Sequence, residues 1–194
     1  MACIGLSMLL GGPPASAYTV GIAAGTRVLY LQVGVGTANA NNPTVNMVSG
    51  TVTGLTNGNG TPLVLNTNST FINSFIDGFA VCSLPNQVYV GGFYRTTAAA
   101  GAGAPAVLTV STPTNLTNGA FVIPFNSISW VSSENPVGST PTIPSGTFTG
   151  GVQTLVSIVR NSWQEQCFAF SYSNAAIRRS GTYLGTATYT LTAP

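Results

Sequence analysis

Apolar residues alternate with polar ones along much of this chain, and no segment repeats them convincingly with the 3.6-residue period of a helix. The clearest run is residues 181–194, which read GTYLGTATYTLTAP. One side of this extended segment carries Tyr183, Gly185, Ala187, Tyr189, Leu191 and Ala193, and the other carries mostly threonines. Such alternation is typical of an antiparallel strand with one face on a core and one in solvent. The pattern therefore predicts an all-β protein.

Shorter runs of the same kind recur between turn signals rich in Gly, Asn and Pro. The expected strands are 18–22, 27–35, 45–55, 63–65, 88–94, 107–110, 121–125, 127–131, 155–159, 167–172 and 181–193. Residues 71–81 fit either a strand or a short helical turn, and 97–106 and 132–146 are expected to be long loops. About ten short strands at this spacing predict an antiparallel β-sandwich, with a barrel or jelly roll next. The length suits one domain over 18–194.

Charged residues make up only 4% of the 194 residues, and the chain has neither histidine nor lysine. General acid–base catalysis needs side chains that titrate near the working pH, so this composition argues against an enzyme. The acids are Asp77, Glu134 and Glu165, and the expected role of Glu165 is an ion pair such as one with Arg160. We expect no catalytic residue, cofactor or metal site. Five arginines are too few and too scattered to predict nucleic-acid binding.

The cysteines Cys3, Cys82 and Cys167 are far apart, and no C-x-x-C spacing indicates zinc. A disulfide between Cys82 and Cys167, formed in an oxidising compartment, is the preferred hypothesis. Two buried free thiols are the alternative. The bridge would close a long loop and stabilise the fold by on the order of 4 kcal/mol in the chain-entropy model.

The first 17 residues, MACIGLSMLLGGPPASA, admit two interpretations. The apolar stretch followed by Ala15-Ser16-Ala17 fits the remnant of a signal peptide cleaved before Tyr18. The same segment also alternates, with one apolar face made of Ile4, Leu6, Met8 and Leu10. Such a strand, followed by a Gly-Gly-Pro-Pro hinge, could add to the sheet of a neighbouring subunit. No run approaches the ~18 apolar residues of a membrane-spanning helix.

The chain resembles fimbrial subunits of the chaperone–usher type and their spore-coat-U-like relatives. The likeness rests on low charge, abundant Thr, Gly and Asn, the expected disulfide, the N-terminal alternating segment, and the long final strand that begins at Gly181. It implies an Ig-like sandwich that lacks one strand, which a periplasmic chaperone and then a neighbouring subunit supply, with an outer-membrane usher as a further partner. The implied assembly strand is Ile4, Leu6, Met8 and Leu10, or else Tyr18, Val20 and Ile22. The implied acceptor edge is Gly181, Tyr183, Ala187, Tyr189 and Leu191.

The expected function is therefore that of a structural subunit of an extracellular, cell-surface filament that polymerises with itself. A chain with so few charges gains little colloidal repulsion, which favours association. A surface adhesin or carbohydrate-binding module is the first alternative, with aromatic side chains stacking on sugars. The aromatic candidates for that role are Tyr89, Tyr94, Trp130, Trp163 and Tyr172. A viral capsid or decoration protein is the second alternative.

Overall fold

The computed structural model describes residues 27–35, 46–97, 103–133 and 140–194. These residues form antiparallel strands joined by turns and loops, with one short 3₁₀ turn, η1 (Phe125–Ser127), and no α-helix among them. The prediction of an all-β, antiparallel fold is confirmed. The expected Ig-like topology stays a prediction.

The larger sheet has the strand order β1-β5-β12-β9-β10, and β3 pairs with the end of β12. The long strands β5 and β12 lie at its centre and pair from Ser162 opposite Tyr94 to Ala169 opposite Gln87. The bounds are β1 (Val28–Val33), β3 (Leu63–Val64), β5 (Gln87–Arg95), β9 (Ile128–Ser132), β10 (Gly146–Thr147) and β12 (Ser162–Tyr172).

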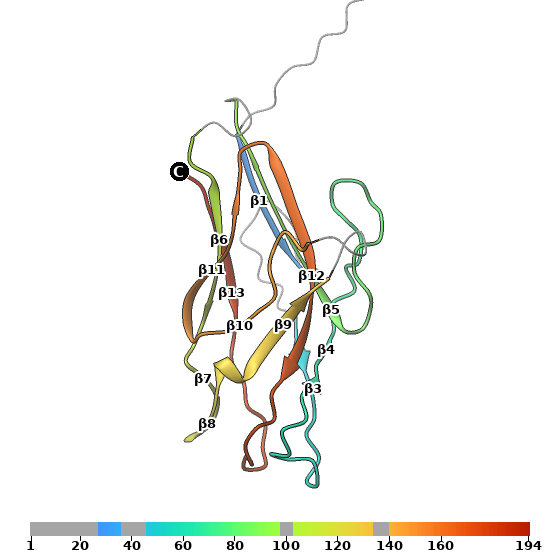
Figure 1. Cartoon of the computed structure of the whole chain (residues 1–194), viewed down its shortest axis with the longest axis vertical. Coiled ribbons are helices and arrows are strands. Elements are labelled where there is room, and N and C mark those ends of the chain that lie inside the picture. Colours follow the sequence, from blue (N-terminus) through green and yellow to red (C-terminus); the bar gives the residue numbers. More distant parts are fainter. Residues whose placement is uncertain (1–26, 36–45, 98–102, 134–139) are drawn as a thin grey trace, which may run out of the picture.

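The second sheet has the order β11-β6-β13 and faces the first, so that the two form a sandwich (Figure 1). Two small pairs lie outside these sheets: β2 with β4, and the hairpin of β7 with β8. The bounds are β2 (Val48–Ser49), β4 (Asn66–Thr67), β6 (Ala106–Thr112), β7 (Asn115–Asn118), β8 (Phe121–Pro124), β11 (Gly151–Ile158) and β13 (Thr188–Thr192).

The main core lies between the two sheets and follows the alternation of the strands. On β6 the buried residues are every second one, from Ala106 through Leu108 and Val110 to Thr112. Opposite them, β12 contributes Phe168 and Phe170. Burial of large apolar side chains contributes roughly 1.5–3 kcal/mol each, so this layer holds the sheets together.

A second apolar cluster covers the outer face of the larger sheet. It consists of Cys82, Tyr89 and Cys167, with Phe71, Ile72, Val81 and Trp163 packed against them. Residues 71–82 therefore fold over β5 and β12 as an additional layer, and β5 is buried on both faces.

Two consecutive glycines, Gly91 and Gly92, lie in the middle of β5. A Cβ on Gly91 would come within 2.4 Å of the hydroxyl of Tyr89, and one on Gly92 within 2.6 Å of the side chain of Ile158. Because neither glycine has a side chain, the Tyr89 ring can lie along the outer face and Ile158 can reach the strand from the inner side.

Two strand predictions are corrected by the structure. The run 45–55 is not one strand, because only β2 forms there and turns follow it. In those turns the backbone N–H of Thr56 donates to the Thr53 carbonyl at 3.1 Å, so local hydrogen bonds replace a ladder. The final strand is shorter than 181–193. Of the two alternatives for 71–81, the structure shows a turn, in which the N–H of Gly78 donates to the Ser74 carbonyl at 3.1 Å, closed by a single bridge between Asn73 and Ala80. The expected strand 18–22 lies outside the described residues.

Candidate functional site

The final strand β13 forms an edge of the smaller sheet. It pairs with β6, from Thr188 opposite Ser111 to Thr192 opposite Val107. Within the described part of the chain, no strand pairs with its other edge. A row of backbone N–H and C=O groups on such an edge is a template for another strand.

The side chains of β13 alternate as the sequence predicts. Leu191 is buried, Ala187 and Tyr189 are half-buried against the core, and the threonines between them are exposed. Burial also raises the pKa of the Tyr189 phenol above its usual value. Because Ala187 and Tyr189 each keep part of their surface exposed, the core is only partly covered along this edge.

The first strand, β1, lies beside β13 at the same side of the sandwich. It pairs with β5 on one side, and no described strand pairs with its other edge. The Arg27 guanidinium donates a hydrogen bond to the Pro194 carbonyl, which ties the two edges together at one end.

Gly181 and Tyr183, which the resemblance also implied for the acceptor edge, precede β13 and lie in a different contact. A Cβ on Gly181 would overlap the side chain of Asn118 at the end of β7, and Leu184 exchanges backbone hydrogen bonds with Thr117. The structure therefore brings Ala187, Tyr189 and Leu191 together at the β13 edge and places 181–184 against the β7–β8 pair.

The predicted assembly strands lie outside the described residues. This applies to Ile4, Leu6, Met8, Leu10, Tyr18, Val20 and Ile22, and also to Cys3. The interpretations of residues 1–17 and 18–22 remain predictions.

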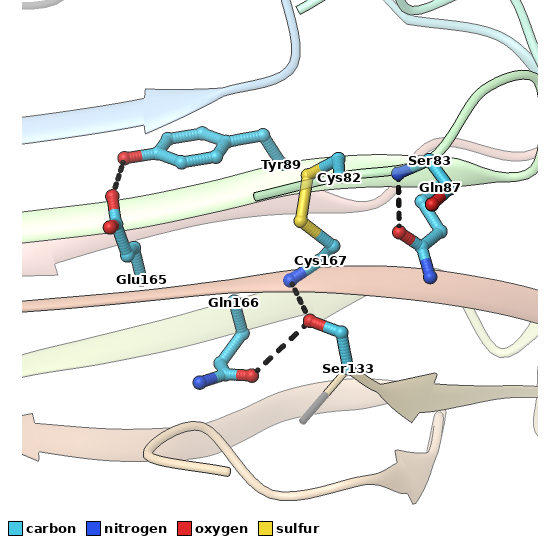
Figure 2. The surroundings of a disulfide bond; sticks show 8 residues. All are labelled: Cys82, Ser83, Gln87, Tyr89, Ser133, Glu165, Gln166 and Cys167. Carbon is cyan, nitrogen blue, oxygen red and sulfur yellow. Dashed lines mark hydrogen bonds between the residues drawn. A yellow bond between two sulfur atoms is a disulfide. The ribbon is translucent and has the colours of Figure 1, made fainter. Parts of the chain in front are cut away.

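The predicted disulfide is confirmed, because Cys82 and Cys167 are bonded with a Cα–Cα distance of 5.4 Å. Both cysteines are buried, and the bond joins the base of the 71–82 layer to β12. Figure 2 shows the backbone N–H of Cys167 donating at 3.2 Å to the hydroxyl of Ser133, on the side of β12 toward β9.

Beside the disulfide, the Tyr89 hydroxyl donates a hydrogen bond to Glu165 Oε2 at 2.6 Å (Figure 2). Burial raises the pKa of the Tyr89 phenol far above its usual value, and the bond to Glu165 and its charge raise it further. The phenol therefore holds its proton, and the pair orients the ring under the 71–82 layer. The expected pairing of Glu165 with Arg160 is replaced by this contact.

The aromatic residues proposed for sugar stacking are mostly core residues. Trp130, Tyr89, Tyr94 and Tyr172 are all buried. Trp163 is half-buried and packs in a cluster with the rings of Tyr30, Phe75 and Phe93. Their faces are therefore largely covered by other side chains.

A polar network that the sequence analysis did not anticipate surrounds Asn174. Its side chain is buried and donates to the Thr56 carbonyl at 2.7 Å and to Asn59 at 2.9 Å, and it accepts from Gly58. Asn174 has a positive φ of 48°, a conformation that asparagine tolerates better than most residues. A hollow of about 150 Å³ borders this network, well below the ~300 Å³ or more of small-molecule sites.

Among the described residues no three acidic, histidine or cysteine side chains gather as a metal site would require. No helix in this part of the chain is long and apolar enough to cross a membrane. Comparisons with protein-family models, curated proteins and solved structures found no match.

Proposed function

We propose that this protein is a structural subunit of an extracellular filament, in which a strand from a neighbouring copy adds to the edge of β13. One observation carries the proposal: Tyr189 on β13 and Ala187 just before it face the core but are only half-buried, and the outer edge of β13 has no partner among the described strands. An added strand would satisfy the backbone groups and cover these side chains together.

The alternating N-terminal segments fit as the added strand. The first offers Ile4, Leu6, Met8 and Leu10, and the second offers Tyr18, Val20 and Ile22. The disulfide fits an oxidising compartment, and the 4% charge content fits a chain that associates. A periplasmic chaperone and an outer-membrane usher are the partners that such assembly would use.

The test places a charge under the proposed added strand. In the isolated subunit, a lysine in place of Ala187 can extend its amine into water past the open edge. An added strand would bury that amine, so we expect Ala187→Lys to remain folded but to form no strand-linked filaments. Thr188→Lys is the matched control, because it adds the same charge to the next residue, on the exposed face.

Negative-stain electron microscopy of native material reads the outcome. Filaments from the unmodified chain and from Thr188→Lys, with none from Ala187→Lys, would support the proposal. Normal filaments from Ala187→Lys would refute it. Mass spectrometry of the filament subunit then tells whether residues 1–17 are retained or whether the chain begins at Tyr18, which identifies the segment that joins the copies.

The same images separate the alternatives. Closed shells would indicate a capsid or decoration protein, and a monodisperse monomer would leave an adhesin. The burial of Trp130, Tyr89, Tyr94 and Tyr172 removes most of the surface on which a sugar would stack, so the filament remains the function that the geometry supports best.

A further inference from the structure

Two exposed apolar patches lie on different parts of the molecule. The first carries a negative charge and the second carries positive charges. The first is the 74–79 loop, the tip of the layer that covers the larger sheet. Phe75, Ile76 and Phe79 are 56%, 58% and 75% exposed there, and Asp77 is exposed among them. Apolar side chains gathered in this way on a surface commonly mark an interaction site.

The 74–79 loop is held firmly. The N–H of Ser74 donates to the Phe79 carbonyl at 2.8 Å, and the Ser74 hydroxyl accepts from the N–H of Ile76 at 3.1 Å. The Asp77 carboxylate accepts from the N–H of Phe79 at 2.9 Å, and the disulfide of Cys82 anchors the base. The loop therefore presents its apolar side chains in a fixed arrangement, which lowers the entropy lost on binding.

The second patch, the arginine end, consists of Phe121, Val122, Ile177, Arg178, Arg179 and Leu184. Ile177 is 82% and Leu184 63% exposed. The guanidinium of Arg179 lies 4.4 Å from the centre of the Phe121 ring. Arg178 donates to the Val122 carbonyl at 3.4 Å, and its Nε has no hydrogen-bond partner in the described structure. The patch is therefore apolar and cationic.

The two patches lie on separate regions of the sandwich. The 74–79 loop lies in the green segment beside β5, whereas the orange-red segment that carries the arginines is at the lower end (Figure 1). One molecule cannot bring its own two patches into contact without unfolding.

We propose that the 74–79 loop of one copy docks on the arginine end of a second copy, with Asp77 facing Arg179. Charge complementarity selects this partner. Of the two acids in the described part of the chain, Glu165 accepts from Tyr89, and Asp77 is the one exposed on an apolar loop. The arginine end offers the matching charge within the same kind of apolar surface. This contact goes beyond strand addition and does not depend on it.

Because the two patches differ, the contact is heterologous. When two copies dock, the arginine end of the first copy and the 74–79 loop of the second copy stay free. Repetition then gives rows of subunits rather than closed pairs. The contact is expected to weaken as salt screens Asp77 and Arg179, since exposed charges are screened over about 8 Å at physiological ionic strength.

Charge exchange tests the proposal. The measurement is sedimentation velocity over a range of concentrations in an Ala187→Lys background, which removes strand addition as a source of association. We expect Asp77→Arg and Arg179→Asp each to weaken self-association by about tenfold or more, because like charges then face each other. The double variant should restore it. Ser157→Arg, on an exposed part of β11, is the control and should have no such effect.

Circular dichroism of each variant first verifies the fold. Weakened single variants with a restored double variant support the contact. Self-association that both single variants leave unchanged, a double variant as weak as either single one, or a background protein that stays monomeric at every concentration would each overturn it. Failure of the filament proposal shows instead as filaments that Ala187→Lys still forms after Asp77→Arg has been added to disable docking, so the two failures are distinguishable.

Discussion

Raising the pH above about 10 should unfold this protein steeply, after a wide range in which pH has little effect. The chain has no histidine and no lysine, and its acids are three. Apart from the α-amino group and Cys3, none of its groups has an ordinary pKa between about 5 and 9. Stability should therefore be nearly constant over that range.

Three buried or half-buried phenols set the alkaline limit. Burial raises the pKa of Tyr30 from 10.0 to about 12, and the pKa values of Tyr89 and Tyr189 are also raised. Above pH 10 the unfolded chain releases these protons while the folded chain retains them, so rising pH favours unfolding.

Each such phenol lowers the free energy of unfolding by about 1.4 kcal/mol per pH unit between its unfolded and folded pKa values. For Tyr30 that window spans about two units, or about 3 kcal/mol in total. The three together give at most about 4 kcal/mol per pH unit just above pH 10. A domain with about 5–15 kcal/mol of stability would lose much of it within two units.

The assay is urea unfolding followed by tryptophan fluorescence at a series of pH values from neutral to about 12. Tyr30→Phe supplies the internal comparison. The difference in the free energy of unfolding between this variant and the unmodified protein at neutral pH should shrink as the pH rises above 10, by up to about 1.4 kcal/mol per pH unit. A stability that is unchanged up to pH 12, or a Tyr30→Phe variant whose free energy of unfolding falls with pH as steeply as that of the unmodified protein, would contradict this prediction.

Three further changes test particular contacts by the same unfolding measurement. Replacing Cys82 and Cys167 together by alanine should lower stability by about 4.5 kcal/mol, because the bond joins residues 85 positions apart; a loss below about 1 kcal/mol would contradict this. Tyr89→Phe should lower it by about 2 kcal/mol, since the Glu165 carboxylate loses its donor; an equal stability would show that the bond contributes nothing. Asn174→Ala should lower stability by about 3 kcal/mol through lost hydrogen bonds and a positive φ, and Asn174→Gly should be less damaging because glycine adopts a positive φ without strain.

The elements predicted best from the sequence are those in which apolar and polar residues alternate along a strand. The alternation of Tyr189, Leu191 and their neighbours placed the right side chains on the core face of β13. The absence of histidine and of C-x-x-C spacing disfavours zinc and leaves a Cys82–Cys167 disulfide or two free thiols; the structure shows the disulfide.

The failures come from contacts that sequence spacing does not encode. Residues 45–55 alternate as a strand would, yet Thr53 and Thr56 bond to each other and the run turns away. Tyr89 was considered for sugar binding because nothing local shows that residues 71–82 cover it. Asn174 gave no signal beyond its residue type, since its partners lie more than a hundred positions away.

The glycine pair in β5 sets a limit on how this sequence can drift over evolutionary time. Any side chain at Gly91 would push the Tyr89 hydroxyl away from Glu165, and any at Gly92 would push Ile158 out of the space between the sheets. A mutation at Gly91 would therefore need a compensating change at Tyr89, and one at Gly92 a compensating change at Ile158, before it could become fixed. The exposed threonines of β13 carry no such linkage, so substitutions that spare an added strand should accumulate there one at a time.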